Sequence, residues 1–118
     1  MSSDPLLHAR ALVLDDLAAC GSTDAAVVSM VEDVVAGRRS WVEQWPEGAA
    51  YVAGQVAQDV QDRMIDEVAR WPLCPRHRDG PDAHELHIEP ALGADSHWVC
   101  DTDGVSVAPL GALGRDPH

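Results

Sequence analysis

The 118-residue chain has no lysine, no asparagine and no phenylalanine, and aromatic residues make up only 4% of it. All eight basic residues are arginines, and 20 acidic residues bring the formal net charge to −12. Proteins that bind nucleic acid need clustered cations to contact the phosphates, and proteins on anionic membranes use polybasic segments. The shortage of positive charge therefore argues against nucleic acid and against a membrane surface as partners.

Long apolar runs and cysteine-rich patterns are also missing. No stretch approaches the roughly 18 apolar residues of a membrane span, and the first residues lack the basic and apolar regions of a signal peptide. Three cysteines cannot all pair within one chain, and their spacing does not resemble a secreted disulfide framework. We therefore expect a protein of the reducing cytoplasm.

Residues 1–71 have the pattern of about three helices. Asp4 can cap a first helix over residues 5–20, because Pro5 suits the first helical position. A second helix is expected to begin after a cap among residues 22–24 and to stop at Gly37. The third and longest helix is expected over residues 46–70, after a short helical turn that carries Trp41 and Trp45.

Apolar residues at helical spacing predict which side of the first and third helices is buried. For the first helix, the expected stripe is Leu7, Leu14, Leu17 and Ala18. For the third helix, the expected stripe is Val52, Val56, Val60, Met64 and Val68. Its opposite side carries Asp59, Asp62 and Asp66, which are typical of a solvated face and could also serve as an acidic docking face.

The pattern changes after Trp71. Residues 72–118 contain six of the eight prolines and five of the six histidines. Short alternating apolar runs predict strands at residues 84–89, 97–100 and 105–108, and Asp101-Thr102-Asp103-Gly104 is a hairpin signal. This segment is poor in large apolar residues, so it needs the helices, a metal ion or both to stay folded.

A cysteine–histidine cluster is the most informative pattern in the sequence. Cys74-Pro75-Arg76-His77 places two potential ligands on one tight turn, which proline favours. Trp98-Val99-Cys100 supplies a second half-site where a strand leads into a turn. Thiolate and imidazole ligands favour Zn²⁺ over Ca²⁺ or Mg²⁺, which prefer oxygen ligands.

Three residues compete to be the fourth ligand: His84, His87 and Asp103. On a strand over residues 84–89, His84 shares the face of Leu86 and Ile88, which we expect to point inward, whereas His87 points to solvent. Carboxylates such as Asp103 are less usual in closed structural zinc sites. The favoured ligand set is Cys74, His77, His84 and Cys100. Ordinary packing of buried cysteines with surface histidines is the competing interpretation.

The arrangement resembles a zinc ribbon, whose two knuckles read CPxC and CxxC-G. Here the first knuckle is Cys74-Pro75-Arg76-His77, and the second covers residues 98–104, with His in place of one Cys and Asp103 in place of another. The pattern is also similar to that of small uncharacterised actinobacterial proteins with CPxH, then HxL, then WxC before a hairpin. The resemblance covers residues 71–113 and implies a zinc-ribbon-like β unit.

Together these patterns predict an α+β fold. An N-terminal helical bundle (residues 1–71) would pack against a small zinc-ribbon-like β region (residues 72–118) in one compact domain. With three or four protein ligands expected on the metal, Zn²⁺ would be structural.

The sequence offers no complete catalytic motif. His84-Glu85-Leu86-His87 is one residue too short for HExxH, whose two histidines share one face of a helix. We therefore expect a cytoplasmic accessory or regulatory protein that binds a protein partner with a basic surface. Two alternatives stay open: a metal-dependent hydrolase with water on the metal and Glu85 or Glu89 as base, and a thiol or zinc redox sensor that uses Cys74 and Cys100.

Overall fold

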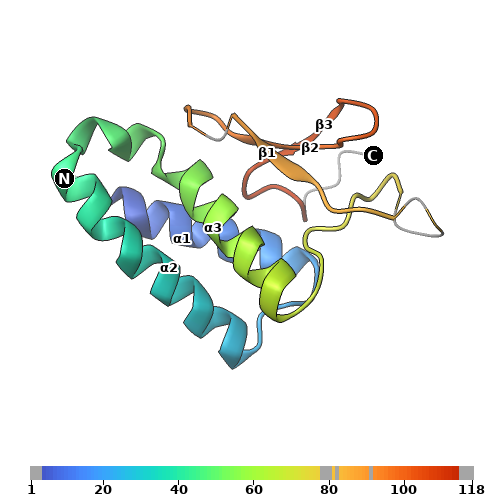
Figure 1. The fold of residues 1–118 in the computed structure, drawn as a ribbon, viewed down its shortest axis with the longest axis horizontal. Coiled ribbons are helices and arrows are strands. Elements are labelled where there is room, and N and C mark those ends of the chain that lie inside the picture. Colours follow the sequence, from blue (N-terminus) through green and yellow to red (C-terminus); the bar gives the residue numbers. More distant parts are fainter. Residues whose placement is uncertain (1–3, 78–80, 82, 91, 115–118) are drawn as a thin grey trace.

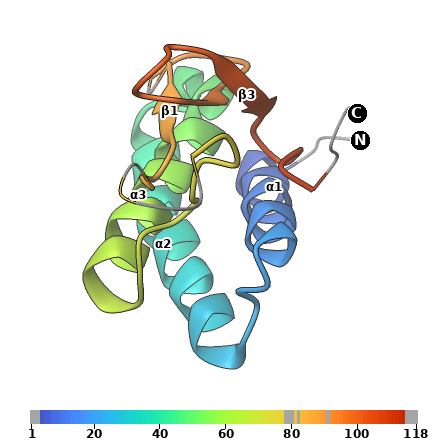
Figure 2. The same ribbon diagram turned by 90° about the vertical axis from the view of Figure 1, so that its right-hand side faces the viewer.

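Three α-helices pack together as a bundle, and a small antiparallel sheet lies over one side of it (Figures 1 and 2). The computed structural model describes residues 4–77, 81, 83–90 and 92–114. The elements in chain order are α1 (Pro5–Ala19), α2 (Ala25–Gln44), the 3₁₀ helix η1 (Pro46–Ala50), α3 (Val52–Glu67), β1 (His87–Glu89), β2 (His97–Val99) and β3 (Ser106–Pro109). The strand order is β1-β2-β3, so the predicted α+β class is confirmed. Helix α2 lies on the far side of α1 and α3 from the sheet (Figures 1 and 2).

The first two helices begin at the predicted caps. The Asp4 carboxylate accepts a hydrogen bond from the backbone N–H of Leu6 at 2.9 Å, and Asp24 accepts one from Val27 at 3.0 Å. These bonds satisfy backbone donors that the first turn of a helix leaves unpaired. Helix α1 then ends next to Cys20, as expected.

The predicted end of the second helix is wrong. Helix α2 runs through Gly37 to Gln44, so the turn expected at residues 40–45 is its last part. A glycine inside a helix costs only about 1 kcal/mol, and Trp41 and Val42 offset this cost by packing against the core. The helix stops at Trp45 because the next residue, Pro46, favours an extended conformation before it.

The third helix is shorter than predicted, and α2 is the longest helix. Residues 46–50 form η1, and α3 ends at Glu67. Four residues of the expected stripe are buried, namely Val52, Val56, Val60 and Met64. Val68 is 57% exposed because it lies beyond the last helical residue.

The predicted apolar stripe of α1 is half right, because Leu17 is buried and Leu14 packs against the core, but Leu7 and Ala18 do not. The buried apolar residues are Leu6, Ala9, Val13 and Leu17, whereas Leu7 is 57% exposed and Ala18 is also exposed. Two apolar stripes overlap in this helix, and the buried one includes Asp16, a carboxylate that normally marks a solvent-facing side. Because an acidic residue interrupts the buried stripe, the apolar periodicity of the sequence predicts a neighbouring side of α1 as the buried one.

The predicted strands are close to the observed ones. Strand β1 covers only the last three residues of the expected 84–89 strand, while Glu85 pairs with Leu73 in an isolated antiparallel bridge. Strand β3 begins one residue later than expected. The predicted hairpin turn connects β2 and β3, and Gly104 has the positive φ of 69° that glycine adopts readily.

The buried carboxylate of Asp16 joins α1 to the β unit. Its Oδ2 accepts hydrogen bonds from the Trp98 indole N–H and the Gly111 backbone N–H, both at 2.7 Å, and its Oδ1 accepts one from Leu113 at 3.0 Å. Burial raises the pKa of Asp16, and these three hydrogen bonds only partly offset that rise. Gly111 packs so closely on Leu12 that a Cβ would overlap it. The chain after β3 is thereby held on α1.

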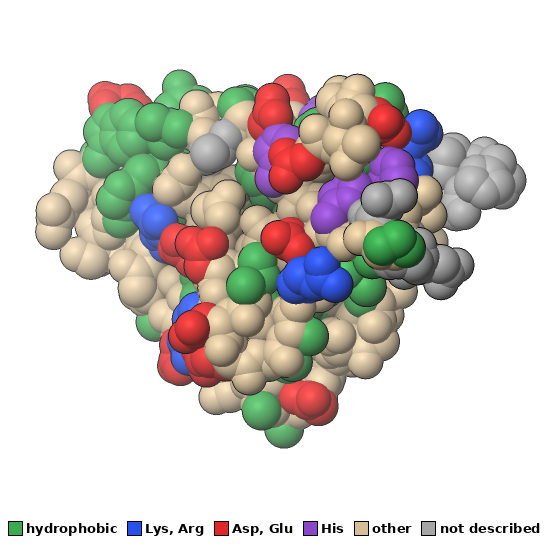
Figure 3. All heavy atoms as spheres, turned by 45° about the vertical axis from the view of Figure 1, so that its right-hand side comes forward, with side chains coloured by type: hydrophobic (Ala, Val, Ile, Leu, Met, Phe, Trp, Pro, Cys, Tyr) green, Lys and Arg blue, Asp and Glu red, His purple; other side chains and the backbone are tan. Residues whose placement is uncertain are grey.

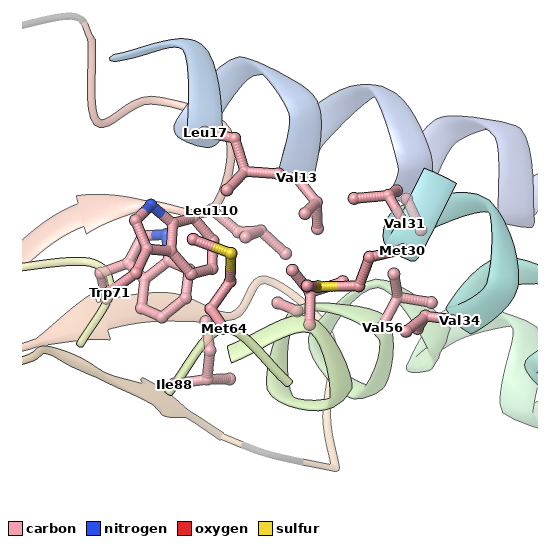
Figure 4. Packing of buried hydrophobic residues seen from close by; sticks show 14 of the residues in the cluster. Val13, Leu17, Met30, Val31, Val34, Val56, Met64, Trp71, Ile88 and Leu110 are labelled. Atoms are coloured by element: carbon pink, nitrogen blue, oxygen red, sulfur yellow. The ribbon is translucent and has the colours of Figure 1, made fainter. Parts of the chain in front are cut away.

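A single apolar cluster fills the space between the two layers (Figure 4). Side chains from the helices, such as Val13, Met30 and Met64, share this cluster with Trp71, which precedes the sheet, and with Ile88 of β1 (Figure 4). The Trp71 ring also packs edge-on against Trp98, with 5.3 Å between the ring centroids. Within the part of the chain that the structure describes, no helix has the length and apolar character to cross a bilayer.

We predict that Asp16→Asn destabilises the fold by about 1–3 kcal/mol, because the new amide group must turn its NH₂ toward at least one buried N–H donor. The matched control is Asp15→Asn at the exposed neighbouring position, which should change stability by no more than about 0.5 kcal/mol. Urea unfolding followed by circular dichroism measures both. Equal stability of the two variants would contradict the anchoring role of Asp16.

Candidate metal centre

Two short segments bring Cys74 and His84 side by side. The backbone N–H of Cys74 donates to the carbonyl of His84 at 2.8 Å, and the N–H of Leu86 donates to the carbonyl of Pro72 at 2.7 Å. The Leu73–Glu85 bridge lies between these two bonds. We call this pairing of residues 72–74 with residues 84–86 the ligand ladder. It places the first cysteine directly across from the histidine that strand alternation favoured.

The CPxH sequence forms the expected tight turn. The backbone N–H of His77 donates to the carbonyl of Cys74 at 3.1 Å, which folds the imidazole back over the thiol. The His77 Nδ1 atom lies 3.6 Å from the Cys74 Sγ atom. One turn therefore supplies two neighbouring ligand atoms.

Cys100 completes the group from the end of β2. Its backbone N–H donates to the Val105 carbonyl at 2.9 Å, and its carbonyl accepts a hydrogen bond from the Gly104 N–H at 2.8 Å. These two bonds close the β2–β3 turn. The Cys100 Sγ atom lies 3.6 Å from His77 Nδ1 and 3.5 Å from His84 Nε2. One ligand atom from each of the four residues lies within 4.8 Å of the others, so Cys74, His77, His84 and Cys100 form a group that could hold a metal ion.

The two thiols differ in acidity. Burial raises the pKa of Cys100, but hydrogen bonds from the Asp103 backbone N–H and the His84 ring more than offset this, and the pKa falls to about 6. Burial raises the pKa of Cys74, and the neighbouring Cys100 raises it further. Cys100 is therefore a thiolate at neutral pH, which is the form that binds metal ions.

The other two candidates for the fourth ligand lie outside this group. The Asp103 carboxylate is behind His77, with its Oδ2 3.8 Å from Nε2 of that ring and 3.0 Å from the Arg76 guanidinium. An acidic group beside the second ring nitrogen favours the tautomer that leaves Nδ1 unprotonated toward the thiols. Asp103 thus stands where it can orient a ligand.

His87 has two acidic neighbours of its own. Its Nε2 contacts Glu89, and its Nδ1 lies 2.6 Å from the Asp101 carboxylate. Histidine and acidic side chains accordingly gather on one part of the surface (Figure 3). Both ring nitrogens of His87 thus lie next to carboxylates, and His87 is not part of the four-residue group.

The docking residues suggested by the sequence are partly engaged within the chain. Asp59 forms a bidentate ion pair with Arg38, at 2.6 and 3.0 Å. Trp41 is half-buried and packs edge-on against Trp45 at 5.3 Å, with Arg38 over its ring at 5.2 Å. Asp62 is exposed and accepts a hydrogen bond from Gln58 at 3.0 Å.

Sequence reasoning missed two buried polar residues that support the site, Asp16 and Gln61. The Gln61 amide donates to the carbonyls of Trp71, at 3.2 Å, and Leu86. The signal for both residues was present, because each polar side chain falls on the buried side of a helix, between residues such as Val13 and Leu17 or Ala57 and Met64. Their hydrogen-bond partners lie in the other layer and could not be inferred from spacing.

Comparison with known proteins gives one match. A family model described as Domain of unknown function (DUF8819) matches residues 2–110. No curated protein and no solved structure matches the chain.

We predict that one thiol of the metal-free protein ionises near pH 6, as measured by the ultraviolet absorbance of thiolate during a pH titration. Cys100→Ser should abolish this step. Cys20→Ser, at an exposed position beside the end of α1, should leave it unchanged. Persistence of the step in Cys100→Ser would contradict the assignment of the low pKa to Cys100.

Proposed function

The chain belongs to the DUF8819 family, and we propose that it binds one structural Zn²⁺ ion and acts by binding another protein. The proposed ligands are Cys74 Sγ, His77 Nδ1, His84 Nε2 and Cys100 Sγ.

The observation that carries the zinc proposal is the set of sulfur–nitrogen distances. A tetrahedral zinc ion with Zn–S of about 2.3 Å and Zn–N of about 2.0–2.1 Å separates a sulfur ligand from a nitrogen ligand by about 3.6 Å. The three sulfur–nitrogen distances, from His77 to both thiols and from His84 to Cys100, are 3.6, 3.6 and 3.5 Å. These three donor pairs match the sulfur–nitrogen spacing around a zinc ion, and all four donor atoms lie within 4.8 Å of one another, which supports the proposal.

The donor set supports a structural role for the metal. Two thiolates and two imidazoles would fill all four tetrahedral positions, whereas catalytic zinc sites usually combine three protein ligands with water. Both cysteines are buried and both histidines are half-buried. A closed, shielded site favours a structural ion over the metal-dependent hydrolase considered from the sequence.

A structural ion would also stabilise the β unit, which has few large apolar side chains to hold it folded. The proposed ligands come from the CPxH turn, the ligand ladder and the end of β2, so one ion would connect all three. Zinc sites of this kind contribute directly to the free energy of folding. The metal would then hold the surface formed by the β unit in one shape.

The charge of the chain supports a partner protein with a basic surface. A net charge of −12 without any lysine favours encounter with a basic protein and disfavours nucleic acid. On α3, Asp62 and Asp66 are exposed and form the proposed docking face, with the half-buried Trp41 as a possible anchor. Asp59 contributes less to this face because Arg38 neutralises it.

We predict one zinc ion per chain in protein purified without chelators, measured by elemental analysis. His84→Ala should weaken zinc binding at least about tenfold, equivalent to about 1.4 kcal/mol, because it removes a ligand. His87→Ala is the matched control and should change the affinity by less than about twofold. Equal effects of the two substitutions, or metal-free protein that does not take up added zinc, would contradict the zinc proposal.

We also predict that a partner retained by the immobilised chain at low salt is lost at about 0.5 M salt, where exposed charges are screened. The double variant Asp62→Asn/Asp66→Asn should retain less partner than the wild type, while Asp15→Asn on α1 should retain the same amount. A partner whose retention is insensitive to both salt and the α3 variant would contradict the proposed docking face.

A further inference from the structure

We infer that Gln61 of α3 is a positioning residue of the metal centre, which holds the ligand ladder at its correct spacing before any metal binds. The inference rests on the proposed function only in naming zinc as the ion. The arrangement itself is formed by α3 and residues 71–86.

The Gln61 side chain is only 4% exposed and reaches both sides of the ladder. Its single Nε2 atom donates to the carbonyl of Trp71, at 3.2 Å, and to the carbonyl of Leu86. Trp71 directly precedes the first ladder segment, and Leu86 is the last residue of the second. One amide group therefore connects the two segments that carry Cys74 and His84.

The amide of Gln61 adds to the two backbone hydrogen bonds of the ladder. Those bonds pair Cys74 with His84 and Leu86 with Pro72. None of these contacts involves a metal ion. All of these hydrogen bonds are made within the chain, so they can hold the first cysteine next to the proposed histidine ligand independently of zinc.

Glutamine is suited to this position because its NH₂ group has two N–H donors on one nitrogen. The two carbonyls accept hydrogen bonds only from N–H groups, so they fix which end of the Gln61 amide faces the ladder, and the 3.4 Å contact of its oxygen with the Gln58 amide is a long one. Leucine would leave both carbonyls without this donor. Glutamate has nearly the same shape, but its ionised form has no N–H to donate.

Holding ligands in place before binding strengthens binding, because less conformational freedom is lost when the metal arrives. Loss of the Gln61 amide should thus weaken zinc binding even though Gln61 is not a ligand. It should also loosen the ladder in the metal-free protein, which a role limited to packing of α3 would not do.

The test compares Gln61→Leu and Gln61→Glu with the control Gln58→Leu, all in the full chain. Gln58 lies on the same helix, and among the described residues its amide donates to the side chains of Gln61 and Asp62 on α3 and to no group of the ladder. Zinc affinity is measured by competition with a chromophoric chelator. We expect both Gln61 variants to bind zinc at least about tenfold more weakly than the wild type, and Gln58→Leu to stay within about twofold.

Hydrogen exchange of the metal-free protein provides a second readout that does not depend on zinc. We expect the backbone amides of Cys74 and Leu86 to be protected in the wild type and in Gln58→Leu. In both Gln61 variants these two amides should exchange faster, while amides within α1 keep their protection. Retained protection of the α1 amides shows that a variant is folded, so a loss of protection confined to the ladder is decisive for either Gln61 variant.

Two results would overturn the inference: unprotected Cys74 and Leu86 amides in the metal-free wild type, or unchanged protection and affinity in both Gln61 variants. A wild-type chain that binds no zinc while the Gln61 variants still lose protection would overturn the zinc proposal instead. The two failures are therefore distinguishable.

Discussion

Three short strands cannot bury enough apolar surface to hold a sheet in place. The rest of this structure depends on the additional contacts by which the helices hold the sheet. Helices α1 and α3 each contribute one buried polar side chain, Asp16 and Gln61, which bonds to groups of the β unit. Trp71 and Trp98, whose rings pack edge-on, take part in these two contacts and belong to the common apolar core. The sheet is therefore fixed by specific hydrogen bonds as well as by apolar contact, and these bonds determine its orientation on the helices.

The same contacts place the metal centre. Trp98 lies two residues before Cys100, and Trp71 lies three residues before Cys74, so both halves of the cysteine–histidine group are attached to residues buried in the core. The acidic Asp103 then stands behind His77, on the side away from the thiols. We propose that zinc completes this framework and that the acidic exterior recognises a basic protein. The proposed chemistry of the centre is consequently a product of the packing between the two layers.

Much of the fold could be predicted from the sequence because its signals are local. Asp4 and Asp24 mark helix starts, and the CPxH turn marks two members of the group that could hold a metal ion. The errors arise where distant residues decide the outcome. The buried side of α1 is set by Asp16, whose partners follow β2 and β3 in the sequence, and α2 continues past Gly37 because Trp41 packs on the core. His84 was favoured from strand alternation, although the ladder with residues 72–74 is what brings it to the cysteines. Ladder pairing is a long-range contact that periodicity does not reveal.

The contacts of Asp16 restrict how this sequence can diverge. Asp16 and Trp98 are 82 positions apart, and a loss of the indole donor could in principle be matched by a change at the acidic position. The other two donors, at Gly111 and Leu113, are backbone N–H groups, which every residue except proline supplies. Compensating substitutions elsewhere cannot remove them, so an acceptor at position 16 is needed in every relative that keeps this path for the chain after β3. Covariation between positions 16 and 98 should accordingly be one-sided, with variation at position 98 and an oxygen-bearing side chain retained at position 16.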